Sequence, residues 1–353
     1  MTAQYPLRPN VPEELRALFR AEELEHIGVV DLTPASEEER EYRAWLANGY
    51  HGSMSFMERH ASLKFRPDTI LTGARSAIFV ALSYYQQETD SEPDVPTGRI
   101  ARYAWGRDYH KELGKRLKRV AHALERRYPG ERFRAFTDAT PLAERYYAER
   151  AGIGFTGRNT LLINSEFGSW FFLGEILSTR RFDAGGPAEF QHGACPHSCR
   201  RCIDACPTGA LLAPYRIDAS RCISYLTIEH PGSIPYEYRE AIGAWLFGCD
   251  RCQEVCPLNG RVKPTQVERF LKPIAGGRVL LEEILHITDD DAFVKRFAGS
   301  PLMRAGRRRM VRNALVVAAN INARTLLPII ETLVTSSDPL IAEHARWALD
   351  HMR

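Results

Sequence analysis

The sequence predicts an α+β fold in three regions, and three observations lead to this prediction. Residues 77–82 form an unbroken apolar run, which is typical of a strand buried on both faces. All eight cysteines lie between Cys195 and Cys256. Residues 310–352 contain three apolar-striped helical segments. At 353 residues more than one domain is expected, and we place an α/β core at 1–185, a cysteine domain at 186–262 and a helical region at 263–353.

The core is expected to open with a surface helix at residues 12–26, whose apolar residues recur at helical spacing until Gly28 ends it. After the strand at 77–82, the polar, proline-containing residues 86–98 predict a loop. Residues 111–127 place four apolar side chains on one stripe and six basic ones largely off it. This pattern predicts an amphipathic basic helix.

The second half of the core is expected to add short strands. Residues 133–136 alternate as a strand and end at Asp138, in a position where sheets often carry chemistry. Residues 160–163 and 169–173 read as two further strands joined by a hairpin-length loop. Asp138 equally suits the N-cap of a helix opening at Pro141, so the residues alone leave its role open.

The helical region is expected to follow a linker at residues 257–277 and a helix at 280–297. Its last three segments, residues 310–321, 325–334 and 339–352, resemble HEAT-type repeats. Asp338 and Pro339 supply an N-cap and a first helical residue for the last one. Because repeat arrays need about three units to stand alone, this region should dock on the rest of the chain.

The cysteine spacing predicts two iron–sulfur clusters. The second run, Cys249-x2-Cys252-x3-Cys256-Pro257, matches the bacterial ferredoxin pattern, whose fourth cysteine ligates the other cluster. That rule uses every thiol, with Cys222 standing in for the missing first member of the second run. The first cluster takes Cys195, Cys199, Cys202 and Cys256, and the second takes Cys206, Cys222, Cys249 and Cys252.

Two zinc sites of four thiolates each are the alternative to the clusters. The Cys-Pro endings and the long separation between Cys202 and Cys249 favour iron and sulfide. One departure from the ferredoxin pattern is the x3 gap between Cys195 and Cys199, where the pattern has x2. Cys195 is therefore the ligand with the weakest support from spacing.

Composition bounds the cellular setting. We find no segment able to span a bilayer and no export signal in the first residues, so we expect a cytoplasmic protein whose thiols stay reduced. The net charge is only +3, but residues 304–312 contain five arginines. The ordinary interpretation of so short a run is a solvent-exposed helix start. The functional interpretation is a basic surface that binds a polyanion.

Two other motifs carry little weight. Residues 152–157 fit G-x-G-x-x-G, but they follow an expected helix and precede an expected strand, which reverses the dinucleotide-binding order. Asp108-Tyr-His110 nearly matches the D-x-H-x-x-G loop of one class of cobalamin proteins, yet Gly114 comes one place late. The simpler interpretation is a helix whose N-terminus is capped by Asp108.

An ordered set of motifs resembles the epoxyqueuosine reductase family. The set covers about residues 10–353, and no single motif decides the resemblance. The matching segments are Trp105 to His110, Asp138 to Arg145, Ala151 to Thr160, Glu166 to Ser169, the cysteine window and Arg221 to Thr227.

The resemblance implies a nitroreductase-like cobalamin-binding core, shared with reductive dehalogenases, and two 4Fe–4S clusters. It implies conversion of epoxyqueuosine to queuosine at the wobble position of tRNA, with Asp138 as the proton donor. Such a donor needs burial to raise its pKa, whereas helix capping would lower it. The implied cobalamin contacts are Lys64, Ser224, Cys249, Asp250 and Asp138 itself, with the backbone around Ala101, Leu162 and Leu173 lining the corrin.

The implied partners are a tRNA anticodon stem-loop and an external electron donor such as flavodoxin or ferredoxin. We expect the protein to be a monomer and not to bind a membrane. Phosphates and unstacked bases call for a basic surface, which we assign to Arg304, Arg307, Arg308, Arg309 and Arg312. The second cluster is expected to lie nearer the cobalt, because Ser224 and Asp250 flank its ligands. Two rival functions are a corrinoid reductase of small molecules and a non-catalytic electron-transfer module.

Overall fold

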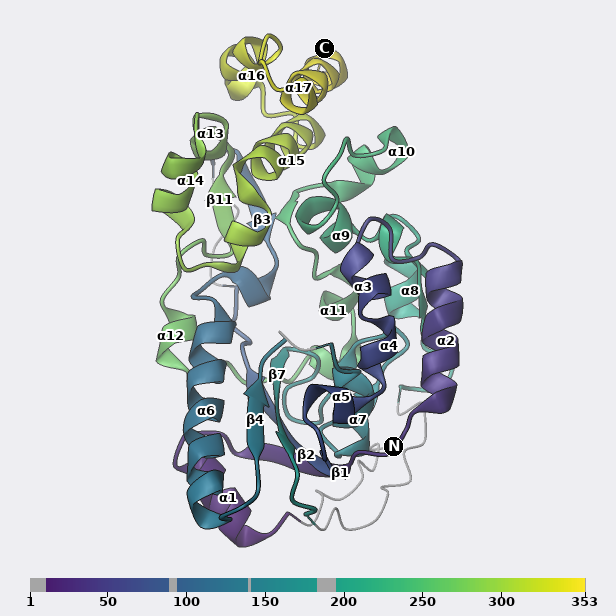
Figure 1. Ribbon diagram of the computed structural model, residues 1–353. Coiled ribbons are helices and arrows are strands. Elements are labelled where there is room, and N and C mark those ends of the chain that lie inside the picture. Colours follow the sequence, from purple (N-terminus) through teal and green to yellow (C-terminus); the bar gives the residue numbers. More distant parts are fainter. Residues whose placement is uncertain (1–10, 89–93, 139–140, 183–194, 353) are drawn as a thin grey trace.

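Two sheets and a helical layer organise the chain, which a computed structural model describes over residues 11–88, 94–138, 141–182 and 195–352. The larger sheet has the order β1-β2-β7-β4, and every neighbouring pair in it is antiparallel. Figure 1 shows this sheet at the end of the molecule away from the C-terminus. Its strands are β1 (His26–Asp31), β2 (Ser76–Ser83), β4 (Phe133–Phe136) and β7 (Phe171–Ser178).

Strand β2 is buried along its whole length, as its apolar run predicts. Helix α6 (Tyr109–Arg127) covers one face of the sheet through its stripe of leucines and Val120. Gly174 of β7 permits this close packing, because a Cβ there would lie 2.5 Å from Leu117 Cδ1. Helix α7 (Glu144–Arg150) packs on the other face. The sheet therefore has two apolar faces, and the α+β class is confirmed.

The start of the chain differs from the expectation. Helix α1 (Glu13–Arg20) ends several residues early, and Gly28 lies within β1 instead of ending a helix. A Cβ on Gly28 would lie 1.9 Å from the carbonyl oxygen of Ala151. Glycine is needed there for a close approach between backbones, which a single sequence read for helix signals does not reveal.

The expected hairpin at residues 160–173 is also wrong. Strand β6 (Leu162–Ile163) pairs with β5 (Phe155–Thr156), while β7 pairs with β2 and β4. Only an isolated bridge between Asn164 and Gly168 closes the turn between β6 and β7. The glycine-rich residues 152–157 do follow a helix and precede a strand, so the reversed order that argued against a nucleotide loop is present.

The smaller sheet, β10-β3-β11, joins all three expected regions. Its strands are β3 (Thr97–Ile100), β10 (Trp245–Phe247) and β11 (Arg278–Leu280). Strand β3 pairs in parallel with β10 and antiparallel with β11. The domain limits at 185/186 and 262/263 stay predictions, but each region contributes one strand to this sheet.

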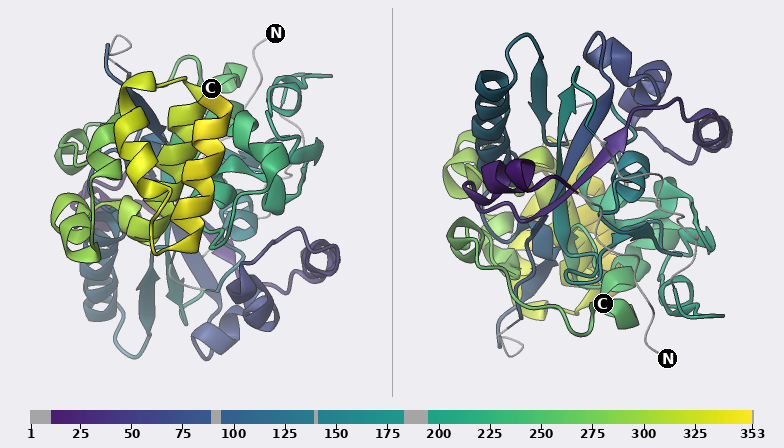
Figure 2. Two further views of the ribbon diagram at one scale, coloured as in Figure 1. Left: turned by 90° about the horizontal axis from the view of Figure 1, so that it is seen from above. Right: turned by 90° about the horizontal axis from the view of Figure 1, so that it is seen from below.

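Helices α13 and α15 pack on the smaller sheet, and α16 and α17 pack on these helices on the side away from the sheet (Figure 1 and Figure 2). The expected helix at 280–297 is two helices, because Asp289 caps a new one by accepting from the backbone N–H of Ala292 at 2.8 Å. Asp338 caps the last helix through the N–H of Leu340 at 2.9 Å. The helices are α13 (Leu281–Leu285), α14 (Asp290–Phe297), α15 (Gly306–Asn320), α16 (Leu327–Leu333) and α17 (Pro339–Met352).

Short elements fill the remaining described segments. The expected loop at 86–98 contains no element before β3, although residues 89–93 lie outside the described part. The expected linker at 257–277 carries only a short turn and one short helix. In the described ranges no helix is long and apolar enough to cross a membrane. The short elements are α2 (Ser36–Ala47), α3 (Ser55–Arg59), α4 (Ala61–Lys64), α5 (Pro67–Ile70), α8 (Arg201–Asp204), β8 (Leu211–Ala213), β9 (Arg216–Ile217), α9 (Ile223–Ile228), α10 (Tyr236–Arg239), α11 (Arg251–Glu254) and α12 (Glu268–Leu271).

Candidate functional site

Four thiols line one cavity, and they are the four that spacing assigns to the first cluster. Helix α8 carries Cys202, and helix α11 ends just before Cys256, so packing of these two short helices brings the ligands together. Arg158 fixes the cavity wall by donating from its guanidinium to the carbonyl of Cys199 at 2.8 Å. The thiols that line the cavity are Cys195, Cys199, Cys202 and Cys256.

The other four thiols, which we call the second group, are half-buried in the chain. Cys222 ends a short 3-10 turn and begins helix α9, while Cys249 and Cys252 flank the start of α11. Cys206 and Cys252 pack on the small apolar cluster that also holds Cys202. Besides burial, neighbouring thiolates also raise the pKa of Cys222, Cys249 and Cys252, and Cys206 is one of the neighbours that act on Cys222 and Cys249.

Burial raises the pKa of three thiols of the second group. The effect is large at Cys252 and is also present at Cys249 and Cys222. Burial similarly raises the pKa of Cys202 to about 11. Thiols in such surroundings stay protonated unless a cation compensates the thiolate charge, and coordinated iron supplies that compensation. A raised pKa makes Cys202, Cys222, Cys249 and Cys252 poor nucleophiles.

Asp138 lies just beyond the end of β4, next to the start of α6. Its backbone adopts φ 52°, a left-handed conformation that is uncommon for a non-glycine residue and frequent at functional sites. The hydroxyl of Tyr109 donates to Asp138 Oδ2 at 2.6 Å, and His110 Nε2 lies 3.6 Å from the same oxygen. The Asp138 side chain is 56% exposed, so a ligand can reach it.

The electrostatics at Asp138 correct one expectation. Burial alone would raise its pKa, but hydrogen bonds from His110 and Tyr109 outweigh burial, and the net shift is downward. The helix-capping alternative is also wrong, because Ala143 occupies the N-cap position of α7. His110 instead has its pKa raised to about 9, by hydrogen bonds with Asp108 and Asp138. The ionisable proton of this pair therefore resides on His110.

Asp108 caps α6 as the sequence predicts, accepting from the N–H of His110 at 3.0 Å. Asp108 Oδ1 also meets His110 Nδ1 at 2.6 Å, which turns the ring toward Asp138. Tyr109 and His110 were therefore not among the predicted site residues. Their signals were the near match to a cobalamin-loop motif and the Trp105 to His110 segment of the family resemblance, and neither predicts a contact with a residue almost thirty positions away.

The implied cofactor contacts other than Asp138 fall into two sets. The first is Lys64, Leu162 and Leu173, and the second is Ala101, Ser224, Cys249 and Asp250. Lys64 donates to the carbonyl of Leu142 at 3.4 Å, beside the loop that carries Asp138. Leu162 and the half-buried Leu173 belong to the apolar cluster on the α7 face of the large sheet. Ala101 belongs to the second set and is tied to the smaller sheet by its N–H bond to Phe247 at 2.8 Å.

Two members of the second set have their side chains committed within the chain. Asp250 is 3% exposed and accepts from the backbone N–H of Arg102 at 2.6 Å and from Gln253 Nε2 at 3.0 Å. Burial raises the pKa of Asp250 to about 6. Its carboxylate thus holds the chain after β3, and only its backbone is left for a cofactor. Ser224 hydrogen-bonds the Cys222 thiol and lowers the pKa of that thiol against the effect of burial.

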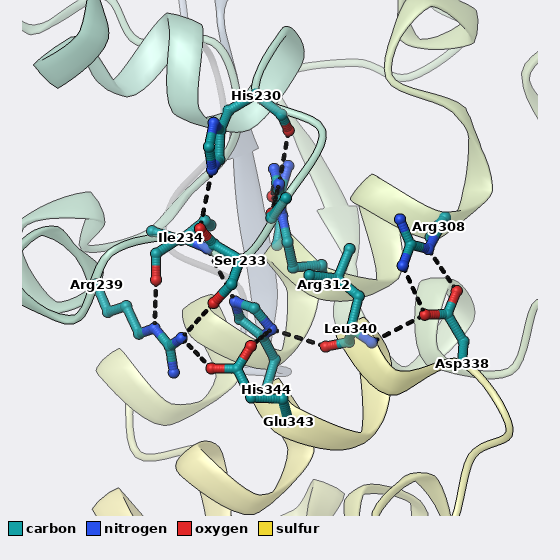
Figure 3. Close-up of polar contacts among 12 residues, drawn as sticks. His230, Ser233, Ile234, Arg239, Arg308, Arg312, Asp338, Leu340, Glu343 and His344 are labelled. Carbon is teal, nitrogen blue, oxygen red and sulfur yellow. Dashed lines mark hydrogen bonds and ion pairs between the residues drawn. The ribbon is translucent and has the colours of Figure 1, made fainter. Parts of the chain in front are cut away.

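The arginines of residues 304–312 are less free than the sequence suggests. Arg304 pairs with Glu229, and it also helps to lower the pKa of Asp138, which places the start of α15 near the site. Arg308 forms a two-point ion pair with Asp338 at 2.5 and 2.9 Å (Figure 3). Arg307 and Arg309 each donate to backbone carbonyls and remain partly exposed.

Arg312 corrects an expectation outright. It is 0% exposed, and its guanidinium donates to the carbonyls of His230 and Gly232 at 2.7 Å and of Leu226 at 2.6 Å. Figure 3 shows its side chain pointing toward His230. Arg312 therefore ties α15 to the segment after Cys222, and it cannot contact an RNA on the surface.

Comparisons with known proteins agree with this geometry. Residues 64–139 match the family model described as epoxyqueuosine reductase QueG, and residues 195–259 match a 4Fe-4S double cluster binding domain. Epoxyqueuosine reductase of Pseudomonas aeruginosa is 39% identical over 331 residues, which cover 92% of this chain and 90% of the relative. The chain belongs to the epoxyqueuosine reductase family. The Escherichia coli member is 38% identical, covering 92% of this chain and 85% of its own.

Solved structures of epoxyqueuosine reductases share the fold. One with an epoxyqueuosine-modified tRNA-Tyr stem loop has a TM-score of 0.87 at 30% identity, covering 96% of this chain and 89% of its own. One from Bacillus subtilis, described with its catalytic aspartate loop swung out of the active site, has a TM-score of 0.86 at 30% identity over 96% and 90% of the two chains. The 195–259 match supports the predicted iron–sulfur clusters in this chain.

We predict unequal effects from two arginine substitutions on α15. Arg312→Met leaves three buried carbonyls without their donor and should lower the free energy of unfolding by about 3–5 kcal/mol. Arg308→Ala removes a half-exposed ion pair, which should cost about 0–1 kcal/mol. Urea denaturation of the full-length protein measures both. Equal losses would contradict the structural role of Arg312.

His110 should titrate well above the ordinary histidine range. Because its folded pKa is raised, its interactions stabilise the fold fully below about pH 6.5, and this contribution disappears as pH rises through about 9. Asp138→Asn should move the midpoint of His110 downward by removing one of its two carboxylate partners. NMR titration of the imidazole measures the midpoint, and an ordinary value in the wild type would refute the described contacts.

Proposed function

We propose that this chain reduces epoxyqueuosine in tRNA to queuosine, using cobalamin that is reduced through two 4Fe–4S clusters. One observation carries the proposal: a protein of this family places a carboxylate with an adjacent proton carrier, Asp138 with His110, in a chain that also groups eight thiols in two sets. Reductive loss of an epoxide oxygen needs electrons and protons at one place. The thiol groups and the Asp138 site supply these two needs.

The first cluster would be held by the four thiols of the lined cavity, Cys195, Cys199, Cys202 and Cys256. The second would be held by Cys206, Cys222, Cys249 and Cys252. Residues 196–198 are exposed beside the first group, whereas Cys249 packs against the main core. Electrons would therefore enter at the first cluster, from a carrier such as flavodoxin or ferredoxin, and pass inward to the second.

A corrin would be held by residues between the large sheet and the second thiol group. A large ring with apolar faces and amide side chains suits the half-buried Leu173 and Tyr103 together with Lys64. The ring would lie within reach of Asp138 and Arg304, because both influence the pKa of Tyr103. Bound cobalamin would supply the electron pair that removes the epoxide oxygen. The protein's own contribution is positioning and proton transfer.

Asp138 would deliver the proton although its own pKa is lowered. His110 holds a proton 3.6 Å away, and Tyr109 anchors the carboxylate at 2.6 Å. As negative charge develops on the epoxide oxygen, a proton can pass from His110 through Asp138 to that oxygen. The lowered pKa thus describes the resting site, with the proton kept on the neighbouring imidazole.

The tRNA would approach over the start of α15. This segment carries Arg304, Arg307, Arg308 and Arg309. The charge of Arg304 also helps to lower the pKa of Asp138. A relative solved with a modified stem loop supports an RNA ligand here. The core would then be nitroreductase-like and the tail HEAT-like, acting as a monomer. Turnover of a free halogenated compound but not of tRNA would favour the dehalogenase-like alternative, and absence of corrin binding would favour an electron-transfer module.

Asp138→Asn should abolish turnover while leaving the cofactors in place. In a strain lacking the gene, tRNA should accumulate epoxyqueuosine, and the wild-type gene should restore queuosine. The Asn variant should fail to restore it, because it can neither accept nor pass on the proton from His110. Mass spectrometry of tRNA nucleosides measures both. Asp291→Asn, an exposed change on α14, is the control, and normal queuosine with the Asp138 variant would overturn its role.

Binding of a stem-loop RNA should weaken steeply as salt rises. If the arginines of α15 contact phosphates, the logarithm of the binding constant falls linearly with the logarithm of salt concentration, and each contact adds about 0.7–0.9 to the slope. Arg307→Ala should reduce the slope by about one contact. Fluorescence anisotropy at several salt concentrations provides the slopes. A flat dependence would exclude this basic interface.

A further inference from the structure

Glu175 is a buried carboxyl group that the proposed roles leave unexplained. It lies near the middle of β7, paired in register with Phe79 on one side and Phe136 on the other, and it is 0% exposed. Within the described part of the chain, neither of its carboxylate oxygens has a hydrogen-bond partner of ordinary length. A buried unpaired carboxylate costs several kcal/mol. A carboxyl group is tolerated in such a place when it is protonated and therefore neutral, or when it has a function in the nearby site.

Glu144 is the acidic neighbour of Glu175. It begins helix α7, which packs on the sheet face that also contacts Leu142 and Tyr147, and its carboxyl is near enough to Glu175 to raise the pKa of that group. Burial raises the pKa of Glu144 to about 8, with Asp138 adding to the rise and Lys64 and Arg145 opposing it. Burial also raises the pKa of Glu175, and Glu144 and Asp138 raise it further. Two carboxyls this close cannot both be ionised.

These groups adjoin the Asp138 site. Phe136, the register partner of Glu175, lies two residues before Asp138, and Glu144 lies six residues after it. The charged groups facing the pair are Asp138, His110, Lys64 and Arg145. Glu144 is only partly buried, whereas Glu175 has no exposure. Asp138 raises the pKa of both Glu144 and Glu175, and His110 lowers that of Glu144, so these groups influence one another electrostatically.

We propose that Glu175 and Glu144 form an acid pair that stores one proton and returns it to Asp138 during turnover. The inference rests on the proposed function. Conversion of an epoxide to an alkene breaks two C–O bonds, forms one C=C bond and releases the oxygen as water, which consumes two electrons and two protons. The electrons come from the one-electron carrier through the clusters. One proton comes from His110 through Asp138, and the acid pair supplies the second by reprotonating the Asp138 site.

A purely structural role makes a different prediction. A neutral glutamic acid and a glutamine have nearly the same shape, so Glu175→Gln would then leave turnover unchanged. If Glu175 carries a transferred proton, the same substitution removes that proton while keeping the packing. Glu149→Gln is the matched control: Glu149 is a buried carboxyl on the same helix as Glu144, and it accepts from Thr156 Oγ1 at 2.6 Å.

The first test does not depend on activity. Infrared difference spectroscopy of the full-length, cluster-loaded protein should show a carbonyl stretch of a protonated carboxyl at pH 7. That band should weaken in Glu175→Gln and in Glu144→Gln, because each carboxyl contributes to it, and it should be unchanged in Glu149→Gln. A band that is unchanged in both variants of the pair would overturn the proposal. If Glu175→Gln does not fold, Glu144→Gln alone decides the outcome.

The second test measures turnover against pH with an epoxyqueuosine-containing stem loop and chemically reduced enzyme. Glu175→Gln should lower kcat by about tenfold or more above neutral pH, with KM unchanged, and activity should recover as falling pH lets solvent reprotonate Asp138 directly. A profile identical to wild type would refute the acid pair. Failure of the wild type itself to reduce the epoxide would overturn the proposed function, and the infrared result would still judge the pair.

Discussion

Grouping of eight thiols around two short helices is the constraint on which the rest of the structure depends. Helices α8 and α11 pack through a small apolar cluster of Cys202, Ile203 and Leu211. Their contact brings together cysteines that are almost fifty positions apart in sequence. Since the thiols span residues 195–256, strand β10 must return to the core between them. It does so by pairing with β3 of the first region, so the cluster domain is part of the body of the protein.

The same interleaving brings Asp138 and Asp250, the neighbour of Cys249, close enough to act on one side chain, Tyr103. Strand β3 leads into the segment that Asp250 holds through the N–H of Arg102, and α6 begins a few residues later with Tyr109 and His110. These two residues position Asp138 at the end of β4. Arg312 fastens the tail to the segment that follows Cys222, which keeps Arg304 close enough to affect Asp138.

Local signals predicted much of the fold, because they depend on neighbours in sequence. The stripe of α6, the buried run of β2 and the Asp338 cap are of this kind. The thiol grouping was also predictable, since a ferredoxin spacing carries its own pairing rule. The family resemblance pointed to Asp138, but the residues alone did not separate it from a helix cap.

What could not be predicted depends on contacts between distant segments. Gly28 is explained by Ala151, the low pKa of Asp138 by His110, and the burial of Arg312 by carbonyls some eighty positions earlier. A charge run in sequence does not reveal which arginine turns inward. Likewise, Glu175 is one polar residue in an apolar strand, and only the partner strands show that its carboxyl has no exposure and an acidic neighbour.

The central claim is that electrons gathered by the thiol-bound clusters remove the epoxide oxygen of a tRNA base beside Asp138. The most direct test incubates the reconstituted, reduced protein with a stem-loop RNA carrying epoxyqueuosine, followed by mass spectrometry of its nucleosides. The account predicts a product lighter by one oxygen atom, whose formation requires cobalamin and an electron donor. An unchanged epoxide, with both clusters and the corrin intact by their visible spectra, would contradict it.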